Sequence, residues 1–145
     1  MRVLGIDFGE RRVGVAVSDA TGTLASPLPT LRRRAGKRPP IRALEELAEA
    51  WEVGAVVMGL PLDLSGNETE WSLHVREVAG ELGRRLNVPV HFVDERMTSV
   101  RAERTIRSLG LPKHKREEKE RIDRTAAILI LQAWLDAEGR RQEPQ

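Results

Sequence analysis

The sequence predicts an α/β domain in which a five-stranded mixed sheet is flanked by helices on both faces. Two observations carry this prediction. The first part of the chain consists of short runs of β-type residues separated by turns, which is typical of hairpin strands. Further along, apolar runs alternate with segments whose apolar residues recur at spacings of three and four, which is typical of strand–helix–strand units.

Three strands are expected first. Residues 3–7 form a short apolar run, residues 9–12 form a turn, and valines alternate with smaller residues over 13–17. This pattern predicts a hairpin. A third strand is expected within residues 24–31, and the two prolines there favour the edge of the sheet, because proline cannot donate a hydrogen bond to a neighbouring strand.

The rest of the chain alternates between helices and strands. Asn67 is expected to cap a helix, with Glu70 as its capping-box partner. The highly charged residues 113–121 are expected to be mobile. We expect a single domain over residues 1–138 and a polar tail over 139–145. The periodicity predicts strands over 55–58 and 90–93 and helices over 41–51, 67–86, 99–108 and 122–137.

Composition narrows the class of protein. The chain has 145 residues, of which 40% are hydrophobic and 32% are charged, as in a soluble globular protein. No apolar run is long enough for a transmembrane helix. The N-terminus begins directly with a strand pattern, so we expect no signal peptide and a cytoplasmic location. The absence of cysteine excludes disulfides and thiolate metal sites.

Basic residues are unevenly distributed, although the net charge is only +2. Residues 32–42 contain six basic residues and no acid, and residues 96–124 contain ten basic residues and five acids. Such clusters favour a polyanionic partner such as nucleic acid, although a solvated arginine-rich surface would give the same pattern. Aromatic residues make up only 3% of the chain, which argues against a base-stacking platform.

Acidic residues occur at the ends of several predicted elements. Asp7 ends the first strand, Asp94 and Glu95 follow the last strand, and Asp123 begins the last helix. Acids that converge from such positions would favour a hard divalent cation, Mg²⁺ or Mn²⁺, and a pair of such ions can hydrolyse phosphodiester bonds.

Each acid also has an ordinary structural interpretation. Asp7 could bond to turn amides, Asp94 or Glu95 could pair with Arg96 or Arg101, and Asp123 could stabilise its helix N-terminus. The alanines at 126 and 127 would let the last helix approach the sheet closely, which could bring Asp123 near Asp7.

At these residues the sequence closely resembles the YqgF/RuvX family of pre-16S rRNA nucleases, also called Holliday junction resolvase-like proteins. The resemblance rests on four segments in order, which are GIDFGERRVGVAVSD, VVMGLPLDLSGNETE, VDERMTS and RIDRTAAILILQAWL. It implies an RNase H-like fold in which the first three strands are antiparallel and the last two run parallel to the first.

The resemblance also implies the residues of the site. The catalytic and metal-binding acids would be Asp7, Glu95 and Asp123, with Glu95 chosen over Asp94 because the family's DER motif places the catalytic acid second. They would hold two ions of Mg²⁺ or Mn²⁺. The residues expected to hold phosphates are Arg11, Arg12, Arg96, Arg101, Lys113, Lys115 and Arg116.

The leading hypothesis is therefore a metal-dependent nuclease that matures the 5′ end of 16S rRNA, as a monomer or a homodimer and without a membrane partner. One alternative is a resolvase of four-way DNA junctions, which would favour a dimer because it makes two symmetric cuts. A second is a nucleic-acid-binding protein without catalysis. An actin-like or Hsp70-like ATPase is disfavoured, because that architecture needs two such domains and 145 residues hold one.

Overall fold

The computed structural model describes residues 1–33, 38–98 and 115–142, and the side chains of residues 115–125 and 142 are outside the description. The elements, in chain order, are β1 (Val3–Phe8), β2 (Arg12–Ser18), β3 (Ala25–Arg32), α1 (Ile41–Ala50), β4 (Ala55–Leu60), α2 (Glu70–Leu86), β5 (Val90–Asp94), the 3₁₀ turn η1 (Glu95–Met97) and α4 (Lys115–Gln142).

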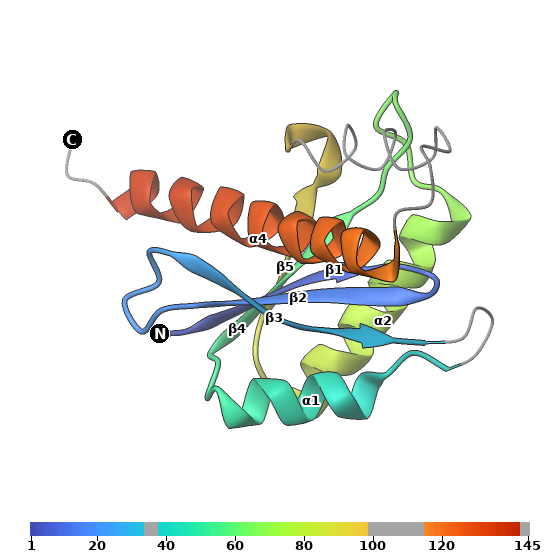
Figure 1. Ribbon diagram of the computed structural model, residues 1–145. Helices are drawn as coiled ribbons and strands as arrows, with labels where there is room; N and C mark the ends of the chain where they lie inside the picture. Colours follow the sequence, from blue (N-terminus) through green and yellow to red (C-terminus); the bar gives the residue numbers. More distant parts are fainter. Residues whose placement is uncertain (34–37, 99–114, 143–145) are drawn as a thin grey trace.

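The five strands form one mixed sheet in the order β3-β2-β1-β4-β5. β2 is antiparallel to both β1 and β3, whereas β4 is parallel to both β1 and β5. This is the arrangement that the resemblance implied. The proline-containing strand β3 lies at an edge, as the sequence predicted. α1 and α2 cover one face of the sheet and α4 lies across the other (Figure 1).

α4 lies unusually close to the centre of the sheet. A Cβ atom added to Gly5 on β1 would lie 2.6 Å from the Cβ of Leu131 and 3.3 Å from the carbonyl oxygen of Ala127. Ala126 and Ala127 are buried in the same contact. The predicted close approach of the last helix is therefore confirmed, and it depends on a glycine in the strand as well as on alanines in the helix.

Two sequence predictions about helix ends are wrong. α4 begins at Lys115 and ends at Gln142, so it extends beyond the predicted helix in both directions. The added residues at its start are lysine, arginine and glutamate, which have high helix propensity, so the helix begins seven residues before the predicted start at 122. The helix also includes residues 139–142, which the sequence assigned to a polar tail. The helix predicted over 99–108 lies outside the described residues.

The cap of α2 is also different from the prediction. Thr69 is the N-cap, its hydroxyl accepts from the N–H of Ser72 at 3.0 Å, and the Ser72 hydroxyl accepts from the N–H of Thr69 at 2.7 Å. Asn67 is instead part of the preceding loop, where its N–H donates to Asp63 at 2.8 Å. A serine thus takes the place that the sequence analysis gave to Glu70.

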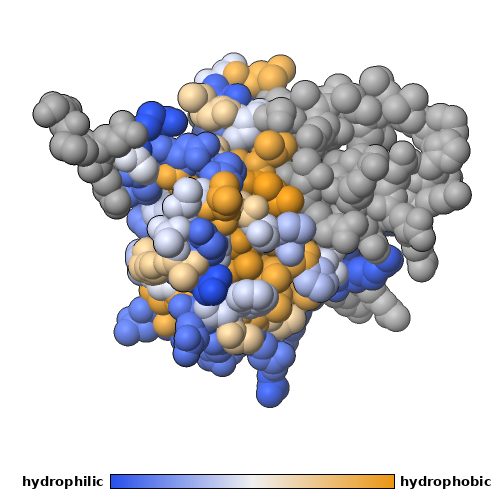
Figure 2. All heavy atoms as spheres, turned by 60° about the vertical axis from the view of Figure 1, so that its left-hand side comes forward, coloured by the Kyte–Doolittle hydropathy of each residue, from blue (hydrophilic) through white to orange (hydrophobic). Residues whose placement is uncertain are grey.

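The surface combines hydrophilic and apolar areas. On the face drawn in Figure 2, hydrophilic residues border a strip of hydrophobic ones across the middle. Among the described helices, none is both long and apolar enough to cross a membrane. Within the part of the chain that the structure describes, the exposed large hydrophobic side chains come from separate segments, as is normal for a protein surface; they are Met1, Leu24, Trp51, Leu64, Leu73 and Met97.

Candidate active site

Asp7 lies on β1 and faces α4. Side chains alternate between the two faces of a strand, so Asp7 shares its face with Gly5 and Val3, which pack under α4. The Asp7 side chain is only 3% exposed. The parallel register pairs Gly5 with Val57 and Ile6 with Met58, so one further step places Gly59 of β4 beside Asp7.

Glu95 reaches the same place from the end of β5. It is the first residue of η1, and its side chain is also only 3% exposed. Its Oε1 atom lies 3.0 Å from the position that a Cβ atom on Gly59 would occupy. Asp7 and Glu95 therefore lie on either side of a glycine that leaves room for a carboxylate. The parallel pairing of β1, β4 and β5 thus brings two buried acids that are far apart in the sequence to the same end and face of the sheet.

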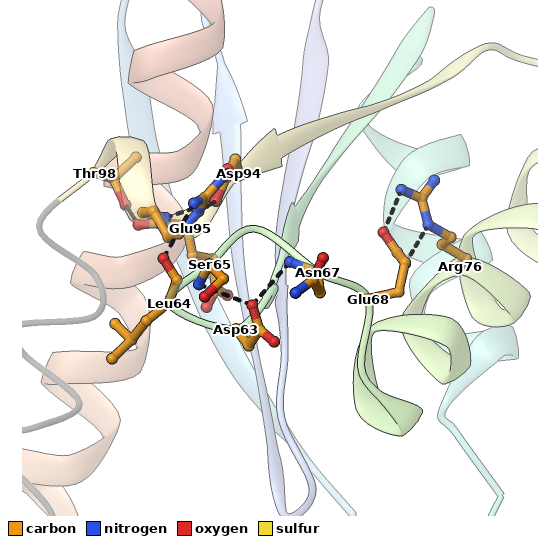
Figure 3. A network of polar contacts seen from close by, with 10 residues as sticks. Asp63, Leu64, Ser65, Asn67, Glu68, Arg76, Asp94, Glu95 and Thr98 are labelled. Atoms are coloured by element: carbon orange, nitrogen blue, oxygen red, sulfur yellow. Dashed lines mark hydrogen bonds and ion pairs between the residues drawn. The ribbon is translucent and has the colours of Figure 1, made fainter.

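Asp94 takes a different role from its neighbour. One of its oxygens accepts from the N–H of Arg96 at 2.9 Å, which caps η1, and its carboxylate forms an ion pair with the Arg96 side chain at 2.7 Å (Figure 3). The structural interpretation offered for this pair of acids thus holds for Asp94. Glu95 is the acid that lies against Gly59.

Asp123 belongs to α4, but its side chain is outside the description. The contacts of α4 show the direction of the helix. The Gln132 side chain bonds to Ala25 and Thr23 at the end of the sheet opposite Asp7, and the Ala127 carbonyl lies over Gly5. Position 123 is one turn earlier, toward the Asp7 end, where Figure 1 shows the start of α4 (orange) beside the β1–β2 turn.

The described side chains do not by themselves form a complete metal site. Among them, no three histidine or acidic groups lie close enough together to hold an ion. Asp7 and Glu95 supply two buried carboxylates at the same end of the sheet, and a third protein ligand would have to come from a side chain outside that description.

Basic residues gather at the same end of the sheet. Arg12 pairs with Arg32 in the β2–β3 register, and the N–H of Arg33 donates to the carbonyl of Arg11 at 2.8 Å. The basic segment that follows β3 therefore starts next to the β1–β2 turn. Of the other predicted phosphate ligands, Lys115 and Arg116 begin α4, whereas Arg101 and Lys113 lie outside the described residues.

Comparison with known proteins decides the family. A family model described as "RuvX: Holliday junction resolvase" matches residues 1–137. The chain belongs to the RuvX family. A relative from Koribacter versatilis, named "Putative pre-16S rRNA nuclease", is 44% identical over 144 residues, covering 99% of this chain and 92% of the relative. A relative of the same name from Corynebacterium glutamicum is 40% identical and covers 99% and 83%. This RuvX-family chain is accordingly a nuclease, as the sequence predicted.

Solved structures confirm the fold. RuvC of Thermus thermophilus, in complex with a Holliday junction substrate, matches with a TM-score of 0.58 at 17% identity over 96% of both chains. The Holliday junction resolvase of fowlpox virus matches with a TM-score of 0.55 at 11% identity over 94% of this chain and 99% of that one. At these identities the likeness concerns the RNase H-like architecture alone.

In this RuvX-family chain the guanidinium of Arg96 is bound by other residues of the protein. Its guanidinium bonds to both oxygens of Asp94, and this pairing raises the pKa of Arg96. It also donates to the carbonyl of Leu64 at 3.3 Å. The sequence predicts that Arg96 holds phosphate, and its contact with the loop after β4 is not visible in the sequence because that contact spans 32 residues of chain.

The β4–α2 loop, residues 61–69, is ordered by its own hydrogen bonds (Figure 3). Asp63 accepts from the N–H groups of Ser65 and Asn67 at 2.9 and 2.8 Å. These bonds, with Asn67 contributing most, lower the pKa of the Asp63 carboxyl. The loop follows β4 at the same sheet end as Glu95, so it borders the candidate site.

Proposed function

We propose that this chain is a divalent-metal-dependent nuclease that matures the 5′ end of pre-16S rRNA. The observation that carries the proposal is that two buried acids, Asp7 on β1 and Glu95 beside Gly59 of β4, lie at the same end of the sheet on the face toward α4. Asp123 on α4 is the third acid of the proposed site. Such an enzyme of RNA maturation would work in the cytoplasm.

The donor set fits Mg²⁺ or Mn²⁺. Both ions prefer carboxylate oxygens, and the chain contains no cysteine that would favour a softer metal. Two neighbouring buried carboxylates repel each other, and a cation between them offsets that repulsion. Gly59 leaves space for the Glu95 carboxylate where any other residue would place a Cβ atom.

The residues of the chain have distinct tasks in this proposal. Asp7, Glu95 and Asp123 would hold two ions, which supply charge stabilisation and lower the pKa of a water molecule when bound. The buried strand and helix fix the acids in place before substrate binds. Arg11 and Arg12, with Lys115 and Arg116 at the start of α4, would hold phosphates beside the scissile bond.

Pre-16S rRNA is the favoured substrate because it appears in the names of relatives that are about 40% identical over almost the whole chain. Resolution of four-way DNA junctions is the second candidate, favoured by the description of the family model and by the fold of RuvC. Symmetric cutting of a junction would require two copies of the chain.

A cleavage panel with the wild-type protein and Asp7→Asn tests the proposal. The substrates are a 16S precursor 5′ leader, an unrelated single-stranded RNA, a DNA duplex and a four-way junction, each with Mg²⁺, Mn²⁺ or EDTA. We expect metal-dependent cutting of the leader that falls below detection in Asp7→Asn, while RNA binding is retained. Cutting by Asp7→Asn would refute the assignment of this acid.

The same panel separates the other functions. Symmetric cutting of the junction alone would identify a resolvase. Salt-sensitive binding without any cutting, and without dependence on metal, would identify a binding protein.

A further inference from the structure

We propose that the ion pair between Asp94 and Arg96 positions Glu95, and that the same arginine fastens the β4–α2 loop to the turn that carries this acid. The inference rests on the proposed function, since it takes Glu95 as a metal ligand. It assigns Arg96 a different task from the phosphate binding that the sequence suggested.

The turn around Glu95 is held from both sides. Before it, the Asp94 carboxylate accepts from the N–H of Arg96 at 2.9 Å. After it, the carbonyl of Glu95 accepts from the N–H of Thr98 at 3.2 Å and from the Thr98 hydroxyl at 3.1 Å. Glu95 begins a 3₁₀ turn of only three residues, so regular secondary structure does little to hold it. These bonds fix the backbone that carries its carboxylate.

The Arg96 side chain adds a planar connection. Its Nε and Nη2 atoms donate to the Oδ2 atom of Asp94 at 3.0 and 2.7 Å, and Nε also reaches Oδ1 at 3.2 Å. A guanidinium holds a carboxylate in a fixed plane, whereas an ammonium group would hold it only as a point charge. Lysine at this position would therefore keep the charge and lose the geometry.

The β4–α2 loop contacts the same guanidinium at Leu64 and Gly66. Nη1 donates to the carbonyl of Leu64 at 3.3 Å. Gly66 lies so close that a Cβ atom there would be 2.7 Å from Nη2, and its φ of +88° is one that L side chains rarely adopt. Arg96 thus links two segments that follow parallel strands at the site end of the sheet.

The described residues contain a matched pair that can serve as a control. Arg76 of α2 donates to both oxygens of Glu68 at 2.8 and 3.0 Å, with its Nε and Nη2 atoms. That pair also joins a carboxylate to Nε and Nη2 of an arginine, with each nitrogen bonded to a different oxygen, and it lies at the start of α2. Among the described residues, neither Arg76 nor Glu68 forms a hydrogen bond or ion pair with η1, and the proposed mechanism gives this pair no task.

The experiment compares Arg96→Lys, Asp94→Asn and their double variant with Arg76→Lys and the wild type. Mn²⁺ affinity is measured by calorimetry on the protein alone, kcat by cleavage of the 5′ leader at several Mn²⁺ concentrations, RNA affinity in EDTA, and Tm by thermal unfolding. We expect Arg96→Lys and Asp94→Asn each to weaken Mn²⁺ binding about 10- to 100-fold or to lower kcat to that extent. RNA affinity in EDTA should stay unchanged.

The double variant should lose no more than the more severe single variant, because both changes break one interaction. Arg76→Lys should change Tm without changing Mn²⁺ affinity or kcat.

Three results would overturn the inference. Arg96→Lys could leave Mn²⁺ affinity and kcat at wild-type values. It could weaken RNA binding in EDTA and reduce the salt dependence of that binding by about one released counterion, as the loss of a phosphate ligand would. It could behave like Arg76→Lys and change Tm alone. If the wild type binds no Mn²⁺, both the inference and the proposed function fail, whereas binding without cleavage defeats only the proposed function.

Discussion

The two faces of the sheet are built from different side chains, although they alternate along the same strands. On β1, Leu4 and Ile6 pack with α1 and α2, whereas Gly5 and Asp7 lie on the face toward α4. The strands present mostly large apolar residues on the first face, and mostly glycine, alanine and valine around Asp7 on the second. The difference shows that adjacent residues can have separate functions, one in stability and the next in the site.

The small-residue face is what brings the site together. Gly5 lets α4 lie directly on β1, and Gly59 leaves space for Glu95. A face packed with leucines would hold the helix farther from the sheet and would fill the place of the carboxylate. The glycines of this face therefore serve the geometry of the acids, and the opposite face supplies most of the large buried side chains.

The largest expected effect is on stability, from Leu4→Ala. Leu4 is 0% exposed, and truncating a buried leucine leaves a cavity that costs about 2–5 kcal/mol. Cleavage by the molecules that remain folded should be unchanged, because Leu4 points away from Asp7. Urea unfolding and kcat at a temperature well below Tm check this. A tenfold loss of kcat in fully folded Leu4→Ala would show that the two faces are not separate.

The alternation of these strands made much of the fold predictable. Period-two valines and the apolar runs before Asp7 and Asp94 identified the strands, and Ala126 with Ala127 predicted the close helix. These signals are local, since each depends only on the spacing of apolar and small residues within one strand or helix. The order of acids along the chain indicated a site, but only the parallel register of β1 with β4 shows that Gly59 separates Asp7 from Glu95.

Contacts between distant segments were not predictable in the same way. The bond from Arg96 to Leu64 joins two loops, and nothing in either loop alone distinguishes an arginine that binds phosphate from one that holds a carbonyl. The cap of α2 was misassigned because Asn67 and Thr69 are both good N-cap residues. Asp63 decides between them, because its carboxylate accepts from the N–H of Asn67 and so holds Asn67 in the loop before the helix.

A smaller effect, on activity rather than stability, is expected from Gly59→Ala. The new methyl group would lie 2.5 Å from Cδ1 of Ile130, which can turn away, and 3.0 Å from Oε1 of Glu95. Alanine in a strand loses less entropy on folding than glycine, so stability should change by no more than about 1 kcal/mol. Displacement of Glu95 should lower kcat about tenfold or more.

Cleavage rates and urea unfolding of the same Gly59→Ala preparation check this expectation, with Gly80→Ala on the outer part of α2 as a control. The contact nearest to a Cβ atom on Gly80 is the flexible end of Arg84, at 3.4 Å. A Gly59→Ala protein with wild-type kcat would mean that Glu95 does not need its place beside β4.

The smallest expected effect comes from an acid at the opposite end of the sheet, and it shows how different a structural carboxylate is from Asp7. Asp19 follows β2 and accepts from the N–H groups of Thr23 and Leu24 and from the Thr21 hydroxyl. These bonds, with Thr23 contributing most, lower the pKa of Asp19 from 3.8 to about 2.

The stabilisation from these bonds is therefore present above pH 3.8 and is lost as the pH falls through 2. Asp19→Asn should be slightly less stable than the wild type at pH 5, and the difference between their urea midpoints should be much smaller at pH 2, because it vanishes only below both pKa values. A difference as large at pH 2 as at pH 5 would show that the carboxylate charge is not what holds this turn, and cleavage at neutral pH should be the same in both proteins.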